Sequence, residues 1–220
     1  MKPLRDPHRH LLRTCPLFAG VADDELDAAL ALLRAHTRSF KRGETLVSAG
    51  APVASAGLVL EGEIEGSFVS EKFTQVDLER FSTGALFGEA IACLGGTSPI
   101  ELRAAEASVV LLLDVAALVK KPQTSAPGTR LLANLALSLA RKDAFLNMKV
   151  RVLSQRGLRD RILVYLQNLP AEKDGWVTLP FTRTELARYL SANRSALSRE
   201  LGRMADEGIV QLSGKRLRIL

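Results

Sequence analysis

The chain has 220 residues, of which 47% are hydrophobic and 25% are charged, and its formal net charge is +6 at pH 7. This composition is that of a globular protein, which excludes a disordered or fibrous chain, and the length suits one large domain or two small ones. No apolar run reaches the roughly 18 residues of a membrane span, and the N-terminus lacks the apolar core of a signal peptide. Two cysteines, Cys15 and Cys93, are too few for a disulfide scaffold or an all-cysteine iron–sulfur cluster. We therefore expect a cytoplasmic protein without a membrane partner.

The first half of the chain predicts a short helical lead-in followed by a β-rich domain. Residues 7–18 suit the lead-in, and residues 23–34 predict a helix with an acidic first turn. From about Phe40 to Asp114, short apolar or alternating runs recur between glycines, at residues 45–48, 57–65, 67–69, 75–81, 102–104 and 109–113. Many short strands with regular glycine turns are typical of an antiparallel sandwich or barrel of the jelly-roll kind.

A long helix is predicted from about Thr129 to Ser154, after a break rich in Pro, Ser and Gly at residues 120–128. Such a helix would be about 39 Å long at 1.5 Å per residue, which is more than one small domain needs to cover. Apolar residues recur at spacings of three and four, with Lys142 and Lys149 interrupting the lower half of this heptad seam. We therefore expect a dimeric coiled coil, and packing against the β domain of the same chain is the alternative. The seam leucines are Leu132, Leu135, Leu139, Leu146 and Leu153.

The C-terminal region predicts a helix at residues 158–169, a short strand at 177–180 and then two short helices joined by a tight turn. Thr182 followed by Glu185 fits a capping box at the start of the first of these two helices. Asn193 suits the N-cap of the second. Leu197, Leu201 and Met204 then recur at helical spacing, which predicts that one face of the second helix is buried.

The opposite face of that second helix carries Arg194, Ser195, Ser198, Arg199 and Gly202. In a helix-turn-helix, the N-terminal residues of the second helix meet base edges in the major groove of DNA. Arginine suits this role because its planar fork can bind O6 and N7 of guanine together. The alternative is an amphipathic helical hairpin whose basic face is merely solvated.

A β-hairpin is predicted at the C-terminus, with strands at residues 209–212 and 215–220 and a turn at Ser213-Gly214. A helix-turn-helix followed by such a basic hairpin is a winged helix, whose wing can touch backbone phosphate. Residues 155–220 hold twelve Lys and Arg against seven Asp and Glu, whereas residues 1–154 hold eighteen against seventeen. The basic excess therefore lies where a phosphate-binding module needs it. The expected DNA contacts are Thr182, Arg183, Arg194, Ser195, Ser198, Arg199, Lys215 and Arg216.

This order of segments resembles the Crp/Fnr transcription regulators along nearly the whole chain. The motifs that carry the resemblance are CPLFAGVADDEL at 15–26, KRGETLVSAG at 41–50, GLVLEGEIEG at 57–66, FGEAIACLGG at 87–96 and TRTELARYLSANRSALSRELGRMADEGIV at 182–210. The third motif looks like the family's hydrophobic-x-x-G hairpin, and the fourth like its F-G-E effector motif. The resemblance implies an α+β protein with a cyclic nucleotide-binding-like jelly-roll domain at 1–127, a dimerisation helix at 128–155 and a winged helix-turn-helix at 156–220.

The resemblance also implies a regulator rather than an enzyme: a homodimer that binds a palindromic DNA operator under allosteric control by an effector. RNA polymerase would be a further partner of an activator. Arg194, Ser195 and Arg199 occupy the family's base-contacting positions, and the cyclic-AMP receptor branch has a glutamate where this chain has Ser195. Because glutamate accepts a hydrogen bond from cytosine and serine is less selective, we expect a different half-site sequence.

The effector region departs from the pattern of cyclic-nucleotide binders. Those proteins place an Arg-Ser or Arg-Thr pair about ten residues after the Gly-Glu, whereas this chain has Ser98-Pro99. Arg103 lies five positions further on, an odd offset that turns it to the other face of a regular strand. We therefore expect neither cyclic AMP nor cyclic GMP, and leave the small-molecule effector unidentified. The expected pocket residues are Phe87, Gly88, Glu89, Ala90, Ser98, Pro99 and Ile100.

Three alternatives remain for the function. A haem-sensing regulator could use His8, His10, His36, Cys15 or Cys93 as axial ligands. A regulator could act through protein contacts without touching DNA. A metalloenzyme of the cupin type would need several histidines on neighbouring strands, and all three histidines precede the expected β region, so we expect no metal site.

Overall fold

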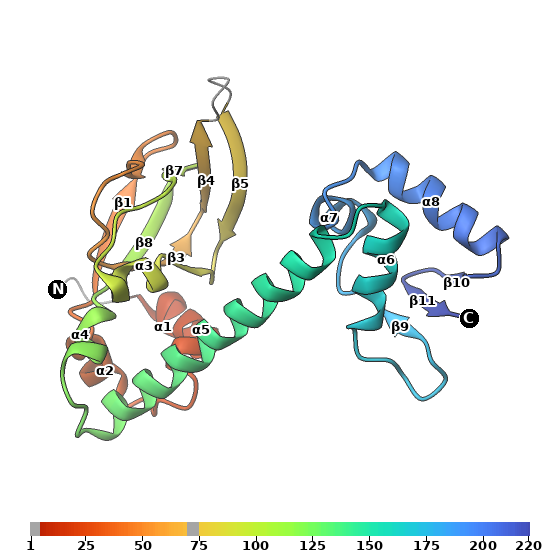
Figure 1. Ribbon diagram of the computed structural model, residues 1–220. Coiled ribbons are helices and arrows are strands. Elements are labelled where there is room, and N and C mark those ends of the chain that lie inside the picture. Colours follow the sequence, from red (N-terminus) through yellow and green to blue (C-terminus); the bar gives the residue numbers. More distant parts are fainter. Residues whose placement is uncertain (1–4, 70–74) are drawn as a thin grey trace. The chain divides into compact units, whose positions relative to one another are not determined.

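The computed structural model describes residues 5–69 and 75–220, and the chain divides into two compact units, residues 1–139 and 140–220 (Figure 1). The elements of the first unit are α1 (Asp6–Thr14), η1 (Pro16–Phe18), α2 (Leu26–Leu32), β1 (His36–Phe40), β2 (Thr45–Val47), β3 (Ala56–Glu61), β4 (Glu63–Val69), β5 (Gln75–Ser82), β6 (Leu86–Phe87), α3 (Glu89–Leu94), β7 (Glu101–Ala104), β8 (Ser108–Leu113), α4 (Ala116–Lys120) and the first half of α5 (Ala126–Leu153). The second unit holds the end of α5, then α6 (Leu158–Gln167), β9 (Val177–Thr178), α7 (Arg183–Tyr189), α8 (Arg194–Asp206), β10 (Val210–Ser213) and β11 (Arg216–Ile219).

The first unit is built on two antiparallel four-stranded sheets, in the orders β1-β8-β3-β6 and β2-β7-β4-β5. Phe40, Val59 and Val110 of the first sheet pack with Ile64 and Leu102 of the second, and this cluster forms the core between the sheets. The predicted mixed α and β class and the jelly-roll-like sandwich are thereby confirmed.

Helices cover the other face of the first sheet, which explains why its central strands β3 and β8 are apolar almost throughout. Along β8, Leu111 and Leu113 pack among helical residues, whereas Val110 faces the core between the sheets. Leu12 of α1 and Leu135 of α5 belong to the helix-covered side. A strand that is buried on both faces cannot alternate polar and apolar residues.

The predicted hairpin at residues 57–66 is wrong. The two strands β3 and β4 do not pair with each other, because β3 lies in one sheet and β4 in the other. Gly62 turns the chain between the sheets with φ 84°, a conformation that favours glycine. A Cβ at this position would lie 2.4 Å from the Ser108 hydroxyl oxygen, so the turn has no room for a side chain.

Three other sequence expectations need correction. The β region begins at His36 and not near Phe40, so one of the three histidines starts β1. Residues 89–94 form α3, a short helix that the glycine-punctuated pattern did not predict. The long helix begins at Ala126, three residues earlier than expected, because Pro127 is compatible with the first turn of a helix.

The second unit is a helical bundle with a three-stranded sheet in the order β10-β11-β9. Leu186 and Leu190 of the α7 region and Leu197, Leu201 and Met204 of α8 are buried in one cluster. Ser213 pairs with Arg216, so the tip of the hairpin is Gly214-Lys215 and not the predicted Ser213-Gly214. Among residues 5–69 and 75–220, no helix is long and apolar enough to cross a membrane.

Candidate DNA interface and effector cavity

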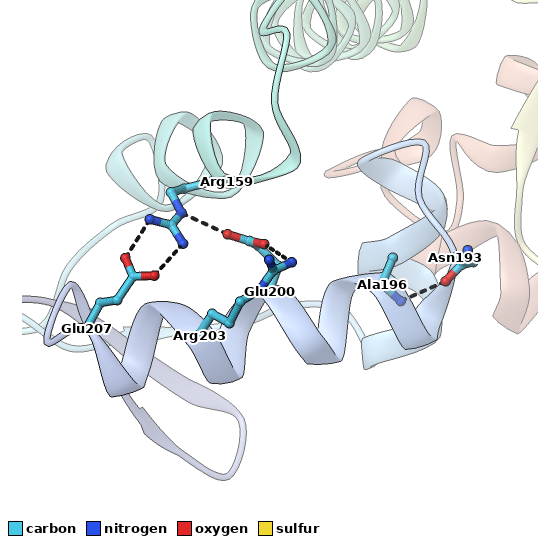
Figure 2. Close-up of polar contacts among 6 residues, drawn as sticks. All are labelled: Arg159, Asn193, Ala196, Glu200, Arg203 and Glu207. Carbon is cyan, nitrogen blue, oxygen red and sulfur yellow. Dashed lines mark hydrogen bonds and ion pairs between the residues drawn. The ribbon is translucent and has the colours of Figure 1, made fainter.

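Local capping interactions start both helices of the predicted helix-turn-helix. The Thr182 side chain accepts a hydrogen bond from the backbone N–H of Glu185 at 3.3 Å, and the Glu185 carboxylate accepts one from the backbone N–H of Thr182 at 2.7 Å. These hydrogen bonds lower the pKa of Glu185. Asn193 accepts a hydrogen bond from the backbone N–H of Ala196 at 2.7 Å, as Figure 2 shows. The predicted capping box and N-cap are confirmed.

The outward face of α8 is open to solvent. Arg194, Ser195, Ser198 and Arg199 are exposed, whereas Leu197, Leu201 and Met204 on the opposite face are buried. In the described part of the chain, neither the Arg194 nor the Arg199 side chain makes a hydrogen bond or an ion pair. Two guanidinium groups at the start of one helix therefore remain available for a partner.

The inward face of α8 holds a cluster of charged residues that the sequence reading missed. Arg159 of α6 donates hydrogen bonds to Glu207 at 2.6 and 2.9 Å and to Glu200 at 2.8 Å (Figure 2). Glu200 is 8% exposed, and its second oxygen pairs with Arg203 at 2.7 Å. The hydrogen bond to Glu207 is the larger cause that raises the pKa of Arg159, and it lowers the pKa of Glu207.

One signal in the sequence could have revealed this cluster. Glu200 follows Leu197 by three residues and precedes Met204 by four, which places a carboxylate on the buried stripe of α8. A buried carboxylate requires a partner, because an unpaired buried charge is costly. Arg159 supplies it, and this arrangement joins α6 to α8.

A basic pocket of about 280 Å³ lies beside the start of α7. Its lining brings together four of the predicted DNA-binding residues, Thr182, Arg183, Arg194 and Lys215. Burial lowers the pKa of the Arg183 guanidinium, and its buried Nη1 has no hydrogen-bond partner among the described residues. The geometry suits an anion such as a backbone phosphate, which guanidinium and ammonium groups bind well.

Arg216 lies outside this pocket and is already engaged. It pairs with Glu172 at 3.3 Å, and its guanidinium carbon lies 5.1 Å from the ring centroid of Trp176. Arg218 approaches the same ring at 5.3 Å. Trp176, which the sequence reading did not single out, thus stacks with the basic strand of the wing.

An apolar cavity of about 260 Å³ lies within the β-sandwich. Five of the predicted effector residues line it, namely Phe87, Gly88, Ser98, Pro99 and Ile100. Glu89 and Ala90 are not part of the lining, and Glu89 is buried at the start of α3. The remaining walls include residues distant in sequence that the pattern did not indicate, among them Arg38, Phe40, Leu46, Val47, Phe81 and Leu112.

The polar groups of this cavity do not fit a cyclic phosphate. The Ser98 hydroxyl donates a hydrogen bond to the carbonyl of Ile100 at 2.6 Å, and Pro99 has no backbone N–H. Arg103 pairs with Glu101 at 2.9 Å and lines a separate polar surface cleft, while its neighbour Leu102 lines the cavity. Arg103 therefore points to the other face of β7, as its odd offset predicts.

The possible haem ligands are dispersed. His8 hydrogen-bonds the carboxylate of Glu61 at 2.7 Å, and Cys15 is buried in the helix-covered core. Burial and the charge of Glu89 raise the pKa of the Cys93 thiol, which disfavours the thiolate that a metal would need. In the described ranges, no group of three or more His, Cys, Asp or Glu is arranged to hold a metal ion.

The predicted seam leucines of α5 differ in their surroundings. Leu135 is 1% exposed in the core of its own unit, and Leu132 and Leu139 pack partly against that core. Leu146 is 57% exposed, and Leu153 is half-buried. Leu137 and Val150 are also exposed, at 54% and 66%. Phe145, Leu146 and Val150 thus expose apolar side chains on the later part of the helix, and Leu137 exposes one on the earlier part.

A ligand-sized cavity in a β-sandwich, a long helix and a winged helix-turn-helix together define a DNA-binding regulator of two domains. Residues 37–124 match the family described as cyclic nucleotide-binding domain, and residues 160–220 match the Crp-like helix-turn-helix domain. The chain is 30% identical to the probable transcriptional regulator flp of Lacticaseibacillus casei over 213 residues, which are 93% of this chain and 91% of that protein.

Two further comparisons agree. Transcriptional regulator SdrP of Thermus thermophilus is 28% identical over 192 residues, covering 84% of this chain and 90% of that protein. The crystal structure of the Thermus thermophilus catabolite activator protein matches with a TM-score of 0.54 and 26% identity, covering 93% of each chain. The chain belongs to the Crp/Fnr family of transcriptional regulators. It is a DNA-binding regulator rather than an enzyme.

Proposed function

We propose that the protein acts as a homodimer whose two α8 helices read the half-sites of a palindromic operator, under the control of an effector other than a cyclic nucleotide. The observation that carries the proposal is the outward face of α8, where Arg194 and Arg199 are exposed and have no partner within the described residues. Recognition helices present such groups to base edges in the major groove.

The phosphate contacts follow from the basic pocket. Thr182, Arg183 and Lys215 lie beside Arg194, so one DNA strand could meet a backbone-binding group and a base-reading group together. Arg216 contributes less to this function, because Glu172 and Trp176 already engage it. Ser195 and Ser198 add short polar side chains that can contact several bases.

The dimer would form along the later part of α5. Leu146 and Val150 are exposed one helical turn apart, and Leu153 continues this apolar stripe. Leu135, in contrast, is buried by packing within its own chain. Leu146→Asp is expected to yield monomers in sedimentation equilibrium and to weaken binding to the palindrome. Ala144→Asp, a substitution at an exposed position on another side of the same helix, should leave the dimer intact.

Effector control would act through the β-sandwich cavity, by shifting the balance between dimer states that differ in operator affinity. A haem-based sensor is the second candidate within the family, and the dispersed histidines and the raised thiol pKa of Cys93 argue against it. The third candidate is a regulator that acts only through protein contacts and does not bind DNA. Contact with RNA polymerase would not by itself identify this candidate, because an activator contacts RNA polymerase in addition to DNA.

The experiment that tests the proposal is selection of bound DNA from a random library, followed by footprinting of the selected site. A palindrome is expected, with half-sites that differ from those of cyclic-AMP receptors. Arg199→Ala should lower affinity for this site by about 1–3 kcal/mol and relax the preference at one position of each half-site. Arg42→Ala, which removes an exposed arginine of the other unit, serves as the matched control.

An unchanged affinity in Arg199→Ala would favour the model of protein contacts. A protected asymmetric single half-site would instead contradict the dimeric reading of DNA. Ser195→Glu provides a gain-of-function check, because the new carboxylate should shift the preferred base at its position towards cytosine.

A further inference from the structure

The β-sandwich cavity has walls that select an apolar ligand. Its lining includes the side chains of Phe40, Val53, Phe87, Ile91, Ile100 and Leu112. Phe87 closes one wall, with its ring 5.1 Å from that of Phe81. A Cβ at Gly57 would lie 2.2 Å from the Phe87 ring, so this glycine leaves the space that the ring occupies.

The size of the cavity limits the ligand. Its volume of about 260 Å³ lies slightly below the range of about 300–1,000 Å³ that is typical of pockets for drug-sized molecules. A bulky or extensively polar ligand would leave its hydrogen-bonding groups unsatisfied against these walls, which is costly. The cavity therefore favours a small molecule with a largely apolar body.

The charge of the cavity is confined to one place. Arg38 is the one charged side chain that lines it within residues 5–69 and 75–220. Its guanidinium carbon lies 4.6 Å from the centroid of the Phe40 ring, and the side chain is 54% exposed. Glu44 approaches Arg38 at 3.6 Å without lining the cavity. A guanidinium is thus held at the rim, above an aromatic wall.

We infer that the cavity binds a small apolar monoanion, of which a hydrophobic monocarboxylate is the simplest example, with its apolar body inside and its anionic group on Arg38. This inference rests on the proposed role of the cavity as the effector site. A monoanion fits better than a phosphate ester, because no second cation lines the cavity among the described residues. Carboxylates pair well with the planar guanidinium fork.

The test is isothermal titration calorimetry of the full chain with three acids, 4-phenylbutyrate, octanoate and 1-naphthoate, and with the primary amide of each. At least one acid is expected to bind, about fivefold more tightly than its amide, since a half-exposed ion pair adds a modest preference. Arg38→Gln should remove this preference and retain the affinity for the amide. Arg42→Gln, which removes a nearby exposed charge outside this cavity, should change neither.

Filling the cavity provides two further variants that do not depend on Arg38. Ile91→Phe and Ile100→Phe each add volume at partly buried lining positions and should weaken the acid and the amide alike by tenfold or more. Circular dichroism melting identifies the variants that fold, and Arg38→Gln at an exposed position is expected to fold in any case.

Several outcomes would overturn the inference. It fails if no acid binds, if Arg38→Gln keeps the preference for the acid, or if binding survives both cavity-filling variants. Binding of cyclic AMP that Ile100→Phe abolishes would also overturn it. Operator affinity measured with and without the bound acid separates this inference from the proposed function. An acid that binds without changing operator affinity supports the ligand class and counts against effector control. Intact operator binding by a protein that binds none of the acids overturns the ligand class and leaves the proposed DNA-binding function standing.

Discussion

Two of the cavities in the protein, one in each unit, have similar volumes and different linings. The pocket beside α7 measures about 280 Å³ and brings Arg183, Arg194 and Lys215 together, whereas the cavity in the β-sandwich measures about 260 Å³ and has one arginine at its rim. Residues 37–124 match the cyclic nucleotide-binding domain family, yet the cavity within this β-sandwich is lined by one cation, whereas three cations line the pocket beside α7.

This difference shows that proteins can share a fold while the chemistry of their sites differs. In the β-sandwich, the residues around the cavity also form the core between the sheets, so a change of ligand chemistry must preserve packing. In the DNA-binding unit, the cations lie at the surface and do not contribute to the hydrophobic core, which is formed by residues such as Leu186 and Leu197. The two sites should therefore respond differently to mutation.

The largest effect is expected from Phe87→Ala, on stability. Phe87 is 5% exposed and contributes to the core between the sheets, so its truncation should lower the free energy of unfolding of the first unit by about 3–5 kcal/mol. Urea unfolding followed by far-ultraviolet circular dichroism measures this loss. Phe87→Leu is the milder control, because it leaves a smaller void.

The single tryptophan of the chain sharpens this measurement. Trp176 lies in the second unit, so its fluorescence reports the unfolding of that unit alone. Phe87→Ala should leave the fluorescence transition in place. If both transitions moved together, the two units would unfold cooperatively, and stability measurements could not distinguish the mutational responses of the two sites.

The second prediction concerns Arg183, whose truncation should affect DNA binding far more than folding. Arg183→Ala removes a partly buried guanidinium that lacks a hydrogen-bond partner at Nη1 within the described residues. Affinity for the selected operator and for unrelated DNA should fall by a similar factor, about tenfold. The slope of log affinity against log salt should decrease by about 0.9, the value for one lost phosphate contact.

The comparison with unrelated DNA is what makes this prediction informative. Removing a base-reading residue would lower the affinity for the operator alone, whereas removing a phosphate contact would lower the affinity for both the operator and unrelated DNA. If Arg183→Ala left the salt dependence unchanged, the pocket would not hold a phosphate. Arg42→Ala serves again as the control for the loss of one positive charge.

The recognition helix could be predicted because its determinants are local. The capping pair Thr182 and Glu185, the N-cap Asn193 and the apolar spacing of α8 all lie within a few residues of the positions they control. The contacts of Arg159 could not be predicted in the same way, because they cross 41 and 48 residues of sequence. Only the isolated Glu200 on the buried stripe hinted at them.

The β-sandwich cavity was predictable only in part for a similar reason. The F-G-E motif and Ser98-Pro99 indicated one side of it, but Arg38, Phe40 and Leu112 come from strands whose neighbours are set by the sheet topology. The exchange of sheets at Gly62 was likewise hidden, since strand pairing depends on distant partners that a local pattern does not specify. The resulting apolar cavity with a rim cation follows from this topology.

The third prediction concerns the orientation of α8. Arg159→Gln breaks the hydrogen bonds to Glu207 and Glu200 that join α6 to α8, and no other described residue except Arg203 pairs with Glu200. Operator affinity should fall several-fold, less than in Arg183→Ala, because the helix stays packed through Leu197 and Leu201. Affinity for unrelated DNA should hardly change, since the exposed cations remain.

A double variant tests whether the effect arises from the ion pair. In Arg159→Gln, the buried Glu200 carboxylate loses its partner from α6. Glu200→Gln removes that carboxylate, so the combined variant should bind the operator better than Arg159→Gln alone. Non-additivity of this kind is the signature of two residues in contact. Equal losses in specific and unrelated binding would instead show that Arg159 acts as a general positive charge.

The smallest expected effect is the pH dependence of the α7 cap. The backbone hydrogen bond from Thr182 holds the pKa of Glu185 below its ordinary value of 4.5, so the folded state favours the carboxylate. Its stabilising contribution is therefore complete above pH 4.5 and is lost as the pH falls through the lower folded pKa. Glu185→Gln should lower the melting temperature of the second unit slightly at pH 6, followed by Trp176 fluorescence. Asp206→Asn, at an exposed position of the same unit whose side chain makes no hydrogen bond or ion pair within the described residues, controls for the loss of one charge. The difference between Glu185→Gln and the natural chain should vanish as the carboxyl protonates, and a difference that stayed constant down to pH 3 would contradict the assignment of the cap to the charged form.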